Sequence, residues 1–108
     1  MAFDSPSRIV VTDYALKNID EIVRYYKSIS DKVAADFLIE LDAAFENISK
    51  TPHFQILFDH YRVVKIRRFP YVIIYRYYEN QNTAKIIILF NTWKDPQRLS
   101  DLEKYLKD

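Results

Sequence analysis

The sequence predicts an α+β domain, with an N-terminal strand and a two-helix hairpin packed on a small, mainly antiparallel sheet and a short C-terminal helix. Two stretches in the first half carry apolar residues at helical spacing. The second half holds aromatic and β-branched runs that are typical of strands, followed by an Asp-Pro step that is typical of a helix start. The chain has 108 residues, which is enough for one core, so we expect one domain over residues 1–108.

The first half should form a strand and two helices. A short apolar run predicts a strand over residues 7–12, after which Thr12 or Asp13 caps a helix that ends near Ser28. Ser30 or Asp31 caps a second helix, which Pro52 stops because the residue before proline avoids helical angles. The apolar faces of the two helices are expected to comprise Leu16, Ile19, Ile22, Val23 and Tyr26, and Val33, Ala34, Phe37, Leu38, Leu41, Ala44, Phe45 and Ile48.

The second half should form the rest of the sheet. Residues 53–60 are compatible with a loop, a short helical turn or a covering segment. Strands are expected over residues 61–68, 71–78 and 84–93, and the run from residue 86 to 90 indicates a strand covered on both faces. A helix is expected from residue 96 to about 106, because Asp95 can cap it and Pro96 fits its first position.

Composition excludes several classes of function. The chain has no cysteine, which excludes disulfides and thiolate chemistry, and no glycine, which excludes glycine-rich phosphate-binding loops. The N-terminus does not resemble a signal peptide, and the longest strongly apolar run is far shorter than the roughly 18 residues of a membrane helix. We therefore expect a cytoplasmic protein that uses neither a cofactor nor a metal.

Charge is unevenly distributed along a chain whose net charge is only +1. Residues 61–76 contain no acid and carry five bases, which are Arg62, Lys65, Arg67, Arg68 and Arg76. Such a stripe favours a local anionic partner over general nucleic-acid binding. If Val64 and Ile66 face the helices, then Lys65 and Arg67 share the open face of the sheet.

The basic stripe has three interpretations at this point. It can bind phosphates and stack on bases, bind an acidic peptide, or only keep an amphipathic sheet soluble. Tyr75 and Tyr77 are expected to pack rather than stack on bases, and Trp93 to form a core lid under the C-terminal helix. His53 and His60 lack a third clustered ligand and should have ordinary polar roles.

Several motifs in order resemble the RelE/ParE family of bacterial type II toxin–antitoxin toxins, which includes plasmid stabilisation proteins. They are the helical stretches "NIDEIVRYY" and "AADFLIELDAAFENISKTP", the steps Tyr61-Arg62, Phe69-Pro70-Tyr71 and Ile74-Tyr75, and the "WKDP" that follows the third strand. The match covers residues 8 to about 98. In this family the RelE branch cuts mRNA on the ribosome, whereas the ParE branch poisons DNA gyrase.

The resemblance is to the ParE branch in particular. Cleaving members often have arginine at the position where this chain has Val72. They also usually have Arg, His or Tyr near the end of the last strand, whereas this chain has Asn91, Thr92 and Trp93 there. The Phe-Pro-Tyr step is typical of ParE. The resemblance therefore implies a gyrase inhibitor rather than an enzyme, and the alternatives are a ribosome-dependent endoribonuclease and an inactive interaction module of the same fold.

The candidate site follows from the basic stripe and the resemblance together. For a nuclease, the candidate catalytic residues are Lys65, Arg67 and Arg76. For contacts to a partner or target, the candidates are Arg62, Lys65, Arg67, Arg68, Tyr75, Arg76 and Trp93. The implied partners are a cognate antitoxin that packs over the toxin and engages the stripe with acids, and DNA gyrase or, alternatively, the ribosome with mRNA.

Overall fold

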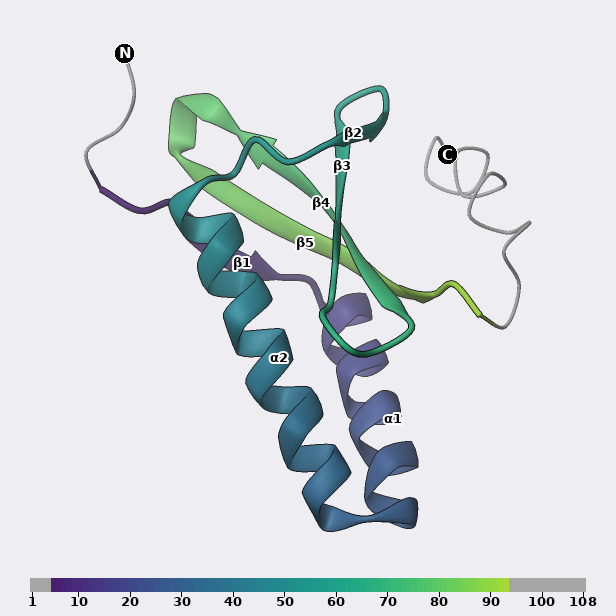
Figure 1. The fold of residues 1–108 in the computed structure, drawn as a ribbon. Helices are drawn as coiled ribbons and strands as arrows, with labels where there is room; N and C mark the ends of the chain where they lie inside the picture. The colour runs from purple at the N-terminus through teal and green to yellow at the C-terminus, as the bar shows by residue number, and fades with distance from the viewer. Residues whose placement is uncertain (1–4, 94–108) are drawn as a thin grey trace.

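The computed structural model describes residues 5–93 (Figure 1). Its elements follow the order β1 (Arg8–Val11), α1 (Asp13–Ile29), α2 (Asp31–Lys50), β2 (Ile56–Phe58), β3 (Tyr61–Lys65), β4 (Tyr71–Tyr78), a short 3₁₀ turn η1 (Glu79–Gln81) and β5 (Thr83–Asn91). The predicted α+β architecture is confirmed. The helix expected from residue 96 lies outside the described residues.

The two helices begin and end where their capping residues predict. The Thr12 hydroxyl accepts a hydrogen bond from the Ala15 amide over 3.1 Å, and the Ser30 hydroxyl accepts one from the Val33 amide over 3.4 Å. Ser30 has extended backbone angles, so it ends α1 and caps α2 at the same position. One residue therefore makes the whole connection of the helical hairpin.

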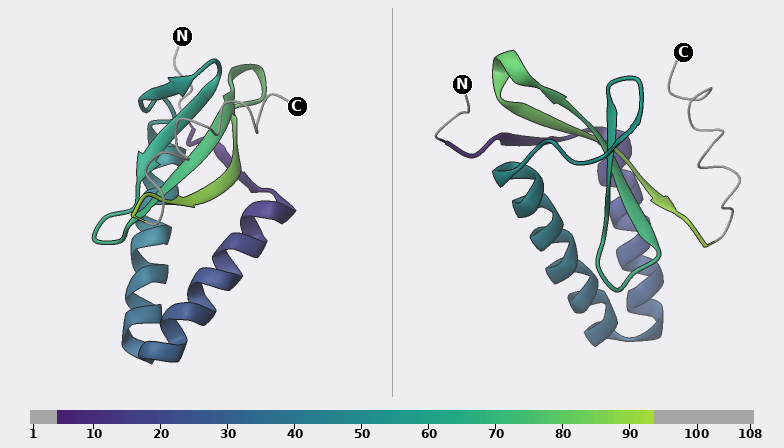
Figure 2. Two further views of the ribbon diagram at one scale, coloured as in Figure 1. Left: turned by 90° about the vertical axis from the view of Figure 1, so that its right-hand side faces the viewer. Right: turned by 45° about the horizontal axis from the view of Figure 1, so that its top comes forward.

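The sheet has five strands in the order β1-β5-β4-β3-β2. β1 runs parallel to β5, and all other neighbouring strands are antiparallel. Both helices lie on one side of this sheet, as two further views show (Figure 2). Beyond the end of β1, side chains of α1 and its N-cap bond to the outer edge of β5. The Asn18 amide oxygen accepts from the Leu89 N–H over 3.1 Å, and the hydroxyl of the N-cap Thr12 donates to the Ile87 carbonyl.

Two predicted segments of the sheet were wrong. The region of residues 53–60 contains β2, a short strand paired with β3, which the prediction did not include. The strand expected over residues 61–68 ends at Lys65, because Arg68 takes a positive φ of 72° and turns the chain into β4. The turn after β4 uses Asn82 at a φ of 45°, which suits a chain without glycine.

The main core lies between the helices and the sheet. Phe37, Ile48, Ile73, Tyr75 and Ile86 are among its fully buried side chains. The predicted apolar faces of the helices hold, except that two members, Leu16 and Leu38, are exposed.

A second apolar cluster covers the opposite face of the sheet. It consists of Ile74, Ile88 and Phe90, with Leu57, Tyr61, Val63, Val72 and Ile87 packed around them. Because β5 is apolar on both faces, its sequence lacks the alternation of a half-exposed strand.

Candidate functional site

The strand register defines the sheet face opposite α1 and α2, which we call the distal face. Lys65 lies opposite Val72, and Tyr61 lies opposite Arg76, which in turn lies opposite Lys85. The apolar cluster occupies the middle of this face. Cations therefore lie near both of its ends, with Lys65 at one and Arg76 and Lys85 at the other.

The Arg76 end of the distal face combines positive charge with aromatic rings. The Arg76 guanidinium carbon lies 5.3 Å from the ring centroid of Tyr61 and 5.3 Å from that of Tyr78. Such cation–π contacts hold the side chain in place while its charge remains available. Lys85 is directly opposite and exposed, and like charges at such a pair are unfavourable. We call Arg76, Lys85, Tyr61 and Tyr78 the basic–aromatic cluster.

Sequence reasoning missed Lys85 as a member of this cluster. The β4–β5 pairing runs in one register from Tyr78 and Thr83 at the turn to Arg76 and Lys85, and it shifts only between Tyr75 and Ile74, farther from the turn. The available signal was a single lysine directly before the apolar run from Ile86 to Phe90.

The predicted basic stripe is not one surface, because three of its cations bind other parts of the chain. Arg62 donates through Nη1 to the Phe54 carbonyl over 2.7 Å, and so holds the segment before β2. Arg68 lies 3.7 Å from the Glu40 carboxylate on α2. Lys65 donates through Nζ to the Phe69 carbonyl over 3.0 Å, within its own turn. Arg67 lies exposed in that turn.

Tyr75 is a correction to the predicted contact set. Its side chain is fully buried on the helix side of the sheet, where its hydroxyl donates to the Pro52 carbonyl over 2.7 Å. The same oxygen accepts from the Phe54 amide over 3.3 Å. Burial raises the pKa of Tyr75 above its ordinary value. The residue holds the loop between α2 and β2, and its burial keeps it from a partner's surface.

The three candidate catalytic cations do not converge on one point. Lys65 and Arg76 are separated by four positions along the strands, or about 13 Å at the ~3.3 Å rise per residue of a strand. Arg67 lies beyond the end of β3. On the described strands, the distal face carries no aspartate, glutamate or histidine. These strands offer charge for binding, and the carboxylate or imidazole that commonly serves as a base in proton transfer is not among their described side chains.

The two histidines lie apart in ordinary settings. His53 packs edge-on against Tyr77, with ring centroids 5.1 Å apart, and His60 lies 3.6 Å from the Asp59 carboxylate. Within residues 5–93, no three His, Asp or Glu side chains cluster in a way that could hold a metal ion.

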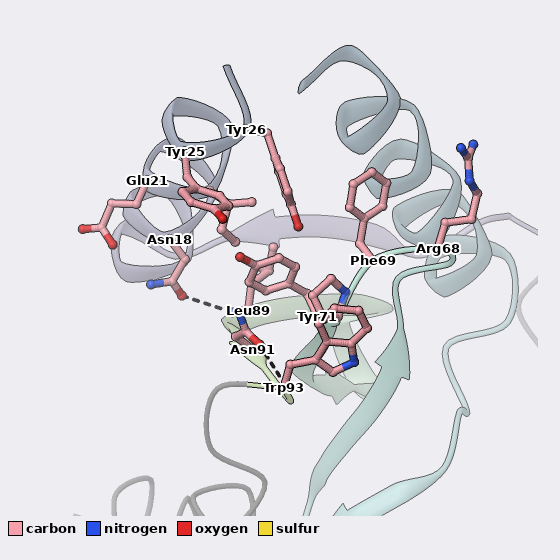
Figure 3. A pocket seen from close by; sticks show the side chains of 12 residues that line it. Asn18, Glu21, Tyr25, Tyr26, Arg68, Phe69, Tyr71, Leu89, Asn91 and Trp93 are labelled. Atoms are coloured by element: carbon pink, nitrogen blue, oxygen red, sulfur yellow. Dashed lines mark hydrogen bonds between the residues drawn. The ribbon is translucent and has the colours of Figure 1, made fainter. Parts of the chain in front are cut away.

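Trp93 is also corrected, because it lies at the surface rather than in the core. Its side chain is 80% exposed and borders a pocket of about 740 Å³ (Figure 3). Residues from α1, from the β3–β4 turn and from the end of β5 line this end pocket: Asn18, Glu21, Ile22, Tyr25, Tyr26, Arg68, Phe69, Pro70, Tyr71, Leu89, Asn91 and Trp93. Of the predicted contact residues, it brings together only Arg68 and Trp93.

Three tyrosines give the end pocket its polar character. Figure 3 shows the phenol oxygens of Tyr25, Tyr26 and Tyr71 pointing toward one another. Burial, together with the neighbouring Tyr71, raises the pKa of Tyr26 to about 12, and burial also raises the pKa of Tyr71. These two phenols are therefore neutral near pH 7 and present hydroxyl groups to the pocket.

The fold and the sequence together define a toxin of a bacterial toxin–antitoxin system. A family model described as the ParE toxin of the parDE type II toxin–antitoxin system matches residues 9–94, and the chain belongs to this family. A search of curated proteins finds no match.

Two solved structures are similar to the chain in fold. One is the chromosomal ParDE system from P. aeruginosa, with a TM-score of 0.68 and 13% identity over 79% of this chain and 95% of that chain. The other is the toxin–antitoxin complex RelBE2 from Mycobacterium tuberculosis, with a TM-score of 0.56 and 17% identity over 84% of this chain and 97% of that chain. Across residues 5–93, no helix is both long and apolar enough to cross a membrane.

Proposed function

We propose that this toxin inhibits DNA gyrase by binding it, without cutting RNA, and that a cognate antitoxin neutralises it. The observation that carries the proposal is the separation of Lys65 from Arg76 on a distal face whose described strands carry no carboxylate or imidazole. RNA cleavage needs a base for the 2′-hydroxyl and charge on the same phosphate. This arrangement supplies charge alone, which suits binding to a macromolecular surface.

The basic–aromatic cluster is the proposed contact surface for an acidic partner. Arg76 is held between two rings, so little side-chain freedom is lost when it binds a carboxylate or phosphate. Lys85 adds a second charge beside it. The family's neutralisation by antitoxin supports an acidic antitoxin segment at this surface, and the association should weaken as salt rises.

Pulse labelling after induction in a bacterial host tests the cellular activity. We expect thymidine incorporation to fall before methionine incorporation, and the purified toxin to block gyrase supercoiling while leaving ribosome-bound mRNA intact. Methionine incorporation that falls first, with cleaved mRNA, would establish the endoribonuclease alternative. If neither falls, the chain is an inactive interaction module.

A matched pair of variants tests the proposed contact surface. Arg76→Ala should weaken gyrase inhibition or antitoxin binding by about tenfold, the usual worth of a charge-assisted hydrogen bond. Lys32→Ala is the control, because Lys32 lies exposed on α2 and pairs only with the nearby Asp36 among the described residues. Equal effects of the two substitutions would exclude the basic–aromatic cluster as the contact surface.

A further inference from the structure

The end pocket is a second surface that differs from the basic–aromatic cluster in both place and chemistry. It lies where α1 meets the β3–β4 turn and the end of β5. At its mouth Trp93 is 80% exposed and Tyr25 is 59% exposed. Large rings left in water at the mouth of a pocket are typical anchors for a partner's side chain.

The polar groups of the end pocket favour a cation. Three phenol oxygens converge inside it and have more lone pairs than hydrogens to donate. Glu21 lines the pocket with its carboxylate directed away from the three rings in Figure 3; it is exposed and forms no ion pair within residues 5–93, so its side chain can turn toward a bound cation. Arg68, the only cation among the described residues that line the pocket, points away from the rings in Figure 3 and lies beside Glu40.

From this arrangement we propose that the end pocket binds an arginine side chain of a partner protein. A guanidinium group stacks on aromatic faces such as that of Trp93 and offers five N–H donors to phenol oxygens and to the Glu21 carboxylate. An acidic side chain would instead meet Glu21 and the phenol oxygens. An aliphatic side chain would leave the phenol oxygens without new partners. The inference does not depend on the toxin's cellular target.

Trp93 is the only tryptophan in the chain, so its fluorescence reports directly on the pocket. The full-length toxin is titrated with the blocked peptide acetyl-Ala-Arg-Ala-amide, and separately with the same peptide carrying citrulline or glutamate. Citrulline keeps the shape of arginine without its charge. We expect a saturable change with the arginine peptide and affinity lower by about tenfold for citrulline, since charge-assisted hydrogen bonds are the stronger ones.

Substitutions separate the pocket from general charge effects. Glu21→Gln should lower the affinity for the arginine peptide by about threefold, as expected for a carboxylate that is exposed to water. Glu46→Gln is the matched control, because Glu46 lies on α2, pairs with Lys50 and does not line the pocket. Tyr71→Phe keeps the ring but removes one phenol oxygen, and should also weaken binding.

Several results would overturn the proposal. They are equal affinity for the arginine and citrulline peptides, tighter binding of the glutamate peptide, and no saturable change at millimolar arginine peptide. Equal loss in the Glu21 and Glu46 variants would assign the effect to overall charge and overturn it as well. None of these results depends on whether gyrase is inhibited.

Discussion

Tyr75→Phe tests whether a buried hydroxyl holds the loop that leads into β2. The substitution removes one oxygen and leaves the ring in the core. The Pro52 carbonyl then loses a donor at 2.7 Å, and the Phe54 amide loses an acceptor at 3.3 Å. Both groups are partly buried, so we expect the free energy of unfolding to fall by about 1–2 kcal/mol. For a chain of this size, that lowers Tm by roughly 5–15 °C.

Urea denaturation followed by circular dichroism measures this loss. Tyr78→Phe is the control, because Tyr78 lies on the distal face and its hydroxyl has no hydrogen-bond partner within residues 5–93. Its effect should stay within about 0.5 kcal/mol. Arg62 donates to the Phe54 carbonyl, so Arg62→Met should couple with Tyr75→Phe in a double-mutant cycle by about 0.5–1 kcal/mol.

Two results would refute the reasoning about Tyr75. The first is an unchanged unfolding free energy, which would mean that the hydroxyl does not hold the loop. The second is weaker antitoxin binding by a variant with native stability, which would restore Tyr75 to the contact surface despite its burial in the unbound toxin.

Three further predictions concern pH, a turn and a cap. The pKa of Tyr26 is raised to about 12 from 10.0, so the unfolded chain loses this proton at lower pH than the folded chain does. The free energy of unfolding that this phenol contributes should be fully present below pH 10 and should fall as the pH rises from about 10 to 12. Thermal unfolding of Tyr26→Phe should show a smaller fall over the same pH range. Asn82→Ala should destabilise the fold by about 1–2 kcal/mol in chemical denaturation, because its φ is 45° and its side chain accepts from the Tyr77 hydroxyl, whereas Asn82→Gly should lose less. Ser30→Ala should cost about 1 kcal/mol by the same measurement, and an unchanged midpoint would show that this cap contributes nothing.

The helices were predictable because their signals are local. Thr12 and Ser30 each cap within three residues, and the spacing of apolar residues shows most of each buried face. β2 was not predictable, since three residues carry little periodicity and its existence depends on pairing with β3. The end of β3 depends on the positive φ at Arg68, a residue type that gives no turn signal.

The site was less predictable than the fold because its residues meet only in three dimensions. The sequence shows five cations between residues 61 and 76. It does not show that Arg62 and Lys65 bind backbone carbonyls, or that Arg68 pairs with Glu40. The end pocket joins residues of α1 to Trp93 through the packing of α1 on β5. No pattern along the chain reports that juxtaposition.

The parallel pairing of β1 with β5 also sets when the toxin can fold during synthesis. Ile9 lies opposite Ala84, a residue made 75 positions later, and α1 is joined to β5 through Asn18 and Leu89. Until β5 leaves the ribosome, the first strand has no neighbour in the sheet. The nascent chain therefore completes this sheet only after β5 has been made, and contacts of such long range make this step the slow one.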